Sequence, residues 1–72
     1  MRRELGTQLG EGDLAQTLSS IAAQHAAVRI GSYPATEPNA PYKVLLRFEG
    51  RDEAAVAAAA TAAAEGLDVF EL

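Results

Sequence analysis

The clearest hydrophobic pattern in the chain lies at residues 42–49, where apolar and mostly polar positions alternate. One side of the pattern holds Tyr42, Val44, Leu46 and Phe48, and the other holds Lys43, Leu45, Arg47 and Glu49. Successive side chains of a strand point to opposite faces of a sheet, so residues 42–48 are predicted to form a strand with one face on a core and the other mostly in water. We expect Val44 and Leu46 to be buried.

Three other segments carry weaker strand patterns. Residues 3–9 place Leu5, Thr7 and Leu9 on one side, although Gly6 weakens this strand. Residues 28–32 alternate and should stop near Pro34, where a loop with three prolines begins. Residues 67–72 predict a short last strand. The alternation does not show which of its residues face the core, because two neighbouring positions, 69 and 70, are both apolar.

A first helix is predicted after the turn at residues 10–12. Asp13 is a suitable N-cap, and Gln16 stands where it could complete a capping box. Apolar or weakly polar residues then recur at helical spacing, namely Leu14, Leu18, Ile21, Ala22 and His25. This spacing predicts an amphipathic helix that ends near His25.

A second helix is predicted after Gly50, with Asp52 as its N-cap. Nine of the eleven residues from Ala54 to Ala64 are alanine, which combines high helix propensity with little side-chain bulk. Alanine also allows a helix to approach a sheet closely, so we interpret this run as packed structure and not as a linker. Gly66 is predicted as the C′ residue that ends the helix.

The predicted element order is βαββαβ in a single domain of residues 1–72. With right-handed crossovers and strands 1 and 3 at the centre, this order predicts an α+β, ferredoxin-like fold. It consists of a four-stranded antiparallel sheet with two helices on one face.

Composition narrows the classes of function. The 72 residues contain no cysteine and one histidine, which excludes disulfides and thiolate chemistry and leaves metal binding to carboxylates. The net charge of −4 disfavours a nucleic-acid partner, because affinity for phosphates comes mainly from lysine and arginine. No apolar run is long enough to span a membrane and no secretion signal follows Met1, so we expect a cytoplasmic location and no membrane partner.

The motifs that could carry chemistry have simpler structural interpretations. Residues 10–15 match the relaxed dinucleotide pattern G-x-G-x-x-A, but Glu11 and Asp13 would place negative charge beside a pyrophosphate. His25 has no second histidine or cysteine with which to form a metal site or a catalytic triad. Asp52 and Glu53 are neighbours at a helix start, where capping explains them better than acid–base catalysis. We therefore predict no catalytic, metal or cofactor-binding residues.

RNA-recognition domains share the βαββαβ order and present aromatic residues of the third strand on the open sheet face. Here Tyr42 and Phe48 share the core side with Val44, and Lys43-Val44-Leu45 departs from the Lys-Gly-aromatic pattern of those domains. These departures argue against RNA binding.

One short stretch is distinctive without containing reactive groups. Gly31, Ser32, Tyr33 and Pro34 form either a candidate interaction loop or a structural loop that packs Tyr33 against the edge of the domain. The sequence leaves both alternatives open.

A family resemblance rests on three segments: residues 10–15, Ile30-Gly31-Ser32-Tyr33-Pro34, and residues 49–54. They resemble the small domain that follows the molybdopterin-binding-like domain in competence/damage-inducible proteins of the CinA type, and a similar segment occurs in the related flavin-nucleotide synthases of eukaryotes. The resemblance covers the chain from about Leu5 to Leu72. The small domain of those proteins has been compared with KH modules, yet this sequence lacks the Gly-x-x-Gly loop between two helices that KH modules contain.

The resemblance implies that chemistry lies elsewhere in such proteins. Their larger domain is associated with metal-dependent pyrophosphatase activity on nucleotides such as ADP-ribose, and some members add a nicotinamide-mononucleotide deamidase domain. We therefore expect this chain alone to be a non-catalytic accessory or interaction domain, with a molybdopterin-binding-like domain of the same or a neighbouring chain as its partner. The alternative from a different class is an ACT-like small-ligand regulatory module, which shares the element order.

Overall fold

The computed structural model describes all 72 residues and has the βαββαβ order predicted from the sequence. Its elements are, in chain order, β1 (Arg2–Thr7), α1 (Glu11–Gln24), β2 (Arg29–Pro34), β3 (Val44–Glu49), α2 (Glu53–Gly66) and β4 (Val69–Glu71). Neither helix has the length and apolar content needed to cross a lipid bilayer.

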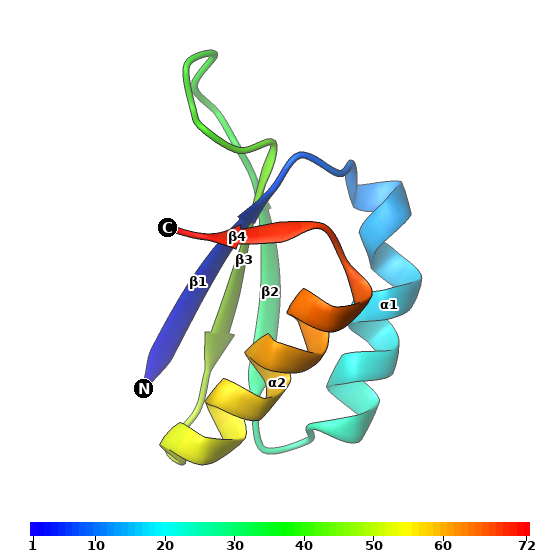
Figure 1. The fold of residues 1–72 in the computed structure, drawn as a ribbon, viewed down its shortest axis with the longest axis vertical. Coiled ribbons are helices and arrows are strands. Elements are labelled where there is room, and N and C mark those ends of the chain that lie inside the picture. Colours follow the sequence, from blue (N-terminus) through cyan, green and yellow to red (C-terminus); the bar gives the residue numbers. More distant parts are fainter.

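The four strands form one antiparallel sheet in the order β2-β3-β1-β4, and both helices cover the same face of it (Figure 1). Strands β1 and β3 are central, which confirms the predicted ferredoxin-like fold. The β1–β3 pairing reaches the first residue of the chain: the Met1 amino group donates to the Gly50 carbonyl oxygen at 2.9 Å, and the Gly50 N–H donates to the Met1 carbonyl oxygen at 3.0 Å.

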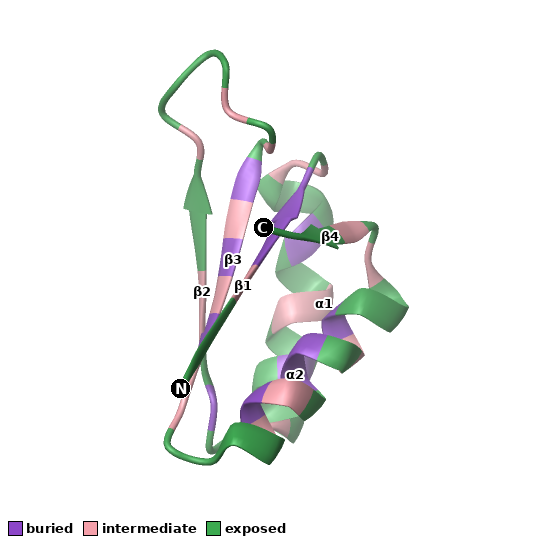
Figure 2. Ribbon diagram, turned by 60° about the vertical axis from the view of Figure 1, so that its left-hand side comes forward, coloured by how far each residue is buried: buried purple, intermediate pink, exposed green.

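The core lies between the sheet and the two helices, as the buried segments in Figure 2 show. The buried apolar residues are Leu5, Leu14, Ile21, Val28, Val44, Leu46, Phe48, Val56, Ala59, Ala60 and Ala63. Val44 and Leu46 are buried as predicted, and the alanines of α2 allow that helix to pack closely on the sheet. Ala22 of α1, expected on the apolar face, is exposed because only a narrow stripe of α1 faces the core.

Thr7 is the one buried polar side chain, and its hydroxyl group is fully hydrogen-bonded. The Thr7 Oγ1 donates to the Asp68 carbonyl oxygen at 2.7 Å and accepts from the Leu9 N–H at 3.1 Å. A buried hydroxyl group needs such partners to offset its loss of water. This residue therefore ties the end of β1 to the segment that leads into β4.

Two helix ends follow the sequence, the start of α2 and the end of α1 near His25, and two depart from it. Asp52 caps α2 as predicted, because its Oδ1 accepts from the Ala54 N–H at 3.0 Å. The prediction that Asp13 caps α1 is wrong: Gly10 is the N-cap, and the Asp13 N–H donates to the Gly10 carbonyl oxygen at 3.0 Å. The helix starts three residues earlier than expected, so Asp13 lies in its first turn, where its charge complements the helix dipole.

Gly66 is also not a left-handed C′ residue. It is the last residue of α2, and no glycine in the chain has a positive φ. The helix ends instead at Leu67, which is extended at φ −135° and ψ 155° while its N–H still donates to the Ala63 carbonyl oxygen at 2.8 Å. A change of ψ at one ordinary residue is enough to turn the chain toward β4.

The strand limits differ from the predictions by one or two residues. Strand β1 stops at Thr7, with Leu9 packed against the core beyond it, and β3 begins at Val44, with Tyr42 partly buried before it. Strand β4 covers only residues 69–71 of the predicted 67–72. Strand β2 begins at Arg29 and ends at Pro34, near which the sequence predicted it to stop, so Tyr33 and Pro34 belong to the strand.

Candidate functional site

The stretch Gly31-Ser32-Tyr33-Pro34 lies in the second half of edge strand β2 and not in a loop. The extended chain continues pairing with β3 as far as Pro34, opposite Val44. Proline fits there because β2 is an edge strand, and its missing N–H faces away from β3. The prediction of a loop is therefore wrong, and the strand distributes these four side chains over two faces of the sheet.

Gly31 and Tyr33 belong to the face of the sheet that no helix covers, which we call the helix-free face. The register places Tyr33, Leu45, Gly6 and Phe70 in one row across all four strands. Gly31, Arg47 and Glu4 form the next row across β2, β3 and β1. Together with Leu72, which follows β4, these residues define the helix-free face as a candidate interaction surface.

Aromatic rings cover both glycines of this face. A Cβ built on Gly6 would lie 2.8 Å from Phe70 Cε1 and 3.1 Å from Leu72 Cδ2, so these side chains occupy the space above β1. A Cβ built on Gly31 would lie 2.8 Å from Tyr33 Oη, so that ring lies along β2 over its own neighbour. The glycines therefore allow the aromatic rings to lie close to the backbone.

The outer sides of these apolar groups meet solvent. Tyr33 is 47% exposed, Phe70 39% and Leu72 53%, which makes them three of the four large apolar residues exposed in the chain. Buried aromatic and aliphatic groups of this size would each contribute substantially to an interface. The helix-free face thus carries apolar surface that folding alone leaves uncovered.

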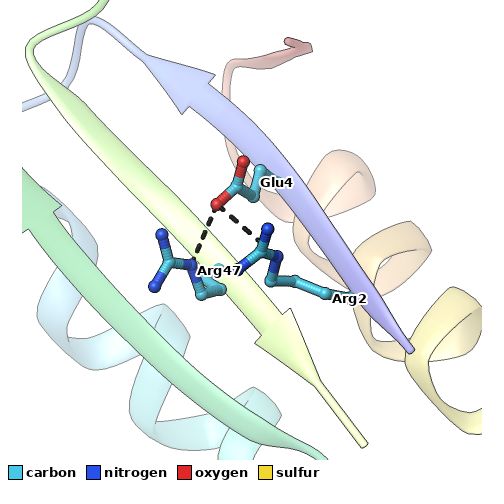
Figure 3. A network of polar contacts seen from close by, with 3 residues as sticks. All are labelled: Arg2, Glu4 and Arg47. Carbon is cyan, nitrogen blue, oxygen red and sulfur yellow. Dashed lines mark hydrogen bonds and ion pairs between the residues drawn. The ribbon is translucent and has the colours of Figure 1, made fainter.

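A charged network runs beside the apolar row. The Arg47 Nε donates to Glu4 Oε2 at 2.9 Å, and the Arg2 Nε lies 4.0 Å from the same oxygen (Figure 3). The hydrogen bond to Glu4 raises the pKa of Arg47 above its ordinary value, so the guanidinium stays charged at every physiological pH. Arg47 also lies 5.0 Å from the centroid of the Tyr33 ring, within the range of a cation–π interaction.

The other sequence candidates are accounted for by local structure. In the stretch at residues 10–15, Gly10 caps α1, and the carboxylate of Glu11 accepts from the Ser32 hydroxyl group at 3.3 Å. His25 is the C-cap residue of α1, partly buried, with its N–H donating to the Ile21 carbonyl oxygen. The structure brings none of these residues to the helix-free face.

The structure contains no group of three or more histidine, aspartate or glutamate side chains that could hold a metal ion. Its largest surface hollow, of about 460 Å³, lies where β2 and β3 meet the start of α2. Arg29, Glu49, Arg51 and Asp52 line it with charges of both signs. The apolar row of the helix-free face lies outside this hollow.

Sequence reasoning found Tyr33 but missed Phe70, Leu72 and the ion pair between Arg47 and Glu4. Phe70 follows Val69, so alternation did not decide which of the two points inward. The alternation of β1 and β3 did contain a signal for the ion pair, because Glu4 and Arg47 both occupy outward positions of strands predicted to be central.

A match to a known protein family identifies the kind of domain that this chain forms. The sequence profile described as "FAD synthase, middle domain" matches residues 1–70. The chain belongs to this family. Comparisons with curated proteins and with solved structures gave no match. The FAD synthase middle domain thus corresponds to the related segment of flavin-nucleotide synthases noted above. The match is to that family and not to CinA-type proteins in particular.

Proposed function

We propose that this FAD synthase middle domain is a non-catalytic interaction module that docks on another protein domain through its helix-free face. The observation that carries the proposal is the exposed row of Tyr33, Phe70 and Leu72 beside the Arg47–Glu4 ion pair. Aromatic residues and arginine are the residue types enriched at the centres of protein interfaces. The site is a surface for association and not a pocket for a reaction.

The shape of the surface favours a macromolecule over a small ligand. Small-molecule sites are concave and enclose most of their ligand. On the helix-free face, by contrast, the aromatic rings of Tyr33 and Phe70 lie over glycines and fill the space close to the backbone. A broad partner surface can cover such an area, whereas a small ligand would remain half in water.

The position of the two chain ends favours a partner in the same polypeptide. Leu72 directly follows β4, and the register between β4 and β1 places Leu72 next to Glu4. Met1 directly precedes β1, which is the strand adjacent to β4. Polypeptide attached at either end would therefore leave the domain from neighbouring strands of the sheet (Figure 1). The family description as a middle domain implies such flanking domains.

The resemblance to CinA-type proteins suggests what the partner is. There the corresponding domain follows a molybdopterin-binding-like domain associated with nucleotide pyrophosphatase chemistry, including chemistry on ADP-ribose. We propose that a domain of this kind, in the same or a neighbouring chain, contacts the helix-free face and carries the activity. An ACT-like regulatory role would instead require saturable binding of a small ligand.

The test is a pair of NMR titrations of the ¹⁵N-labelled chain. A molybdopterin-binding-like domain of a FAD synthase, added in trans, should shift the amide signals of Tyr33, Leu45, Arg47 and Phe70. Tyr33→Ser should weaken this binding, whereas Thr36→Ala in the exposed loop after β2 should leave it unchanged.

The second titration uses FMN, FAD, ADP-ribose and nicotinamide mononucleotide one at a time. The amide signals should remain in place with each compound. Saturable shifts at micromolar ligand, at residues 10–13 or elsewhere, would contradict the interaction-module assignment and favour the regulatory alternative. Failure of the protein domain to shift the helix-free face would remove the docking proposal itself.

A further inference from the structure

The outer edge of β2 carries backbone groups with no partner strand. Strand β2 pairs only with β3, and Ala35, just after the strand, donates its N–H to the Lys43 carbonyl oxygen at 2.8 Å. Hydrogen-bonding groups alternate in direction along a strand, so Tyr33 and Gly31 also face β3, while Ile30 and Ser32 present their N–H and C=O groups outward. An edge of this kind is a template for another strand.

The flank of α1 beside this edge carries small exposed side chains. The Ser32 hydroxyl group donates to Glu11 Oε1, which shows that this side of α1 adjoins β2. Ala15 and Ala22 follow Glu11 at helical spacing on the same flank, and both are exposed. Small side chains allow a second helix to approach closely. A strand edge with free hydrogen-bonding groups therefore lies next to a helix flank on which the exposed residues Ala15 and Ala22 are small.

We propose that a second copy of this chain pairs on this side, with β2 antiparallel to β2 about a two-fold axis at Gly31 and the two α1 helices side by side. In this register Ile30 of one copy faces Ser32 of the other, and each pair exchanges its outward N–H and C=O groups. The two-fold axis generates this pair twice, as Ile30 opposite Ser32 and Ser32 opposite Ile30. The two sheets join into one continuous sheet with all four helices on the same side.

The same register brings complementary side chains together on the helix-free face. Arg29 of one copy lies opposite Tyr33 of the other. Arg29 is exposed and forms no ion pair within the chain, and the Tyr33 ring is about half exposed. Arginine beside an aromatic ring is attractive. Gly31 opposes itself at the axis, where the absence of a side chain allows a close approach. The surface is thus self-complementary, as a two-fold interface requires.

Ser32→Pro tests the strand pairing, with Ser32→Ala as its matched control. Both variants lose the side-chain hydrogen bond to Glu11, but only proline removes the outward N–H, and no backbone hydrogen bond within the chain is lost. Sedimentation equilibrium should show dimerisation of the parent and of Ser32→Ala at similar concentrations. The midpoint for Ser32→Pro should rise about tenfold or more. Far-ultraviolet circular dichroism verifies that each variant is folded.

A second pair of variants tests the helix contact without altering the strand. Ala22→Arg adds bulk and charge to the proposed α1 interface, whereas Ala23→Arg places the same side chain on the solvent side of the helix. Only Ala22→Arg should weaken the dimer. Hydrogen exchange of the Ile30 and Ser32 amides should slow as the protein concentration increases, because the outward N–H groups become bonded.

A chain that stays monomeric to millimolar concentration, or a dimer that Ser32→Pro and Ala22→Arg both leave intact, would overturn the proposal. The dimer uses Tyr33 of the helix-free face, but its test can be told apart from the docking test, because the variants at Ser32 and Ala22 change no residue of that face.

Discussion

The two faces of the sheet are built from the same strands but are completed in different ways. On the helix side, Leu46 and Phe48 of β3 are fully buried beneath the two helices. On the helix-free side, their neighbours Leu45 and Arg47 are only partly covered, and what covers that face comes from the strands themselves. Its aromatic rings lie over glycines, and its charges pair across adjacent strands.

This difference separates residues that hold the fold from residues that are available for contact. The helix side buries apolar area and therefore supplies most of the hydrophobic driving force. The helix-free side stabilises the sheet weakly and leaves Tyr33 and Phe70 partly exposed. Substitutions on the two faces should consequently differ in size, and the three expectations that follow test this contrast from the largest effect to the smallest.

Leu46→Ala should lower the free energy of unfolding by about 2–5 kcal/mol, because it creates a cavity at a fully buried position. Leu45→Ala is the matched control on the opposite face of the same strand, and it should cost about 1 kcal/mol or less. Urea denaturation of both variants measures the difference. Equal losses would mean that both faces of β3 carry the fold.

Gly6→Ala should displace the Phe70 ring, since the new Cβ would lie 2.8 Å from Phe70 Cε1. We expect a loss of about 1–2 kcal/mol, at the lower end of overpacking effects because Phe70 can swing toward solvent. In the background of Phe70→Ala the same substitution should cost much less. A double-mutant cycle by thermal unfolding measures this coupling, and additive effects would show that the ring does not cover Gly6 in solution.

The Arg47–Glu4 pair should have the smallest effect of the three, because both side chains are about a third exposed and solvent screens them. The variants Arg47→Met and Glu4→Gln, alone and combined, give the coupling energy in low and high salt. Since hydrogen bonding raises the pKa of Arg47, its contribution is lost only as pH rises through that raised value, so this arginine should cause no loss between neutral and mildly alkaline pH. A coupling that salt leaves unchanged would point to a contact better shielded than the structure shows.

The sequence was sufficient for the architecture because alternation and helical spacing report directly on which side chains face the core. The burial of Val44 and Leu46, the central position of β3 and the cap at Asp52 all follow from such local signals. Helix α1 shows the limit of this reasoning. Asp13 suits the N-cap by residue type, yet the helix begins after Gly10, and the sequence pattern held no signal for this earlier start.

The candidate surface was less accessible to sequence reasoning. Tyr33 was noticed, but the proline after it suggested a loop, whereas an outer strand tolerates proline. Phe70 and Gly6 are 64 positions apart, and their contact depends on the register between β1 and β4. No pattern within either segment specifies that register.

The hydrogen bonds between Met1 and Gly50 determine how anything joined to the amino terminus would be oriented. A peptide N–H donates to the Gly50 carbonyl oxygen as well as the terminal ammonium does, so upstream residues would enter the sheet without a break. The junction would have little conformational freedom, because the strand already fixes the direction of the residue before Met1. The strand would thus set the direction in which a preceding segment reaches Met1, and a longer connection would loosen that constraint.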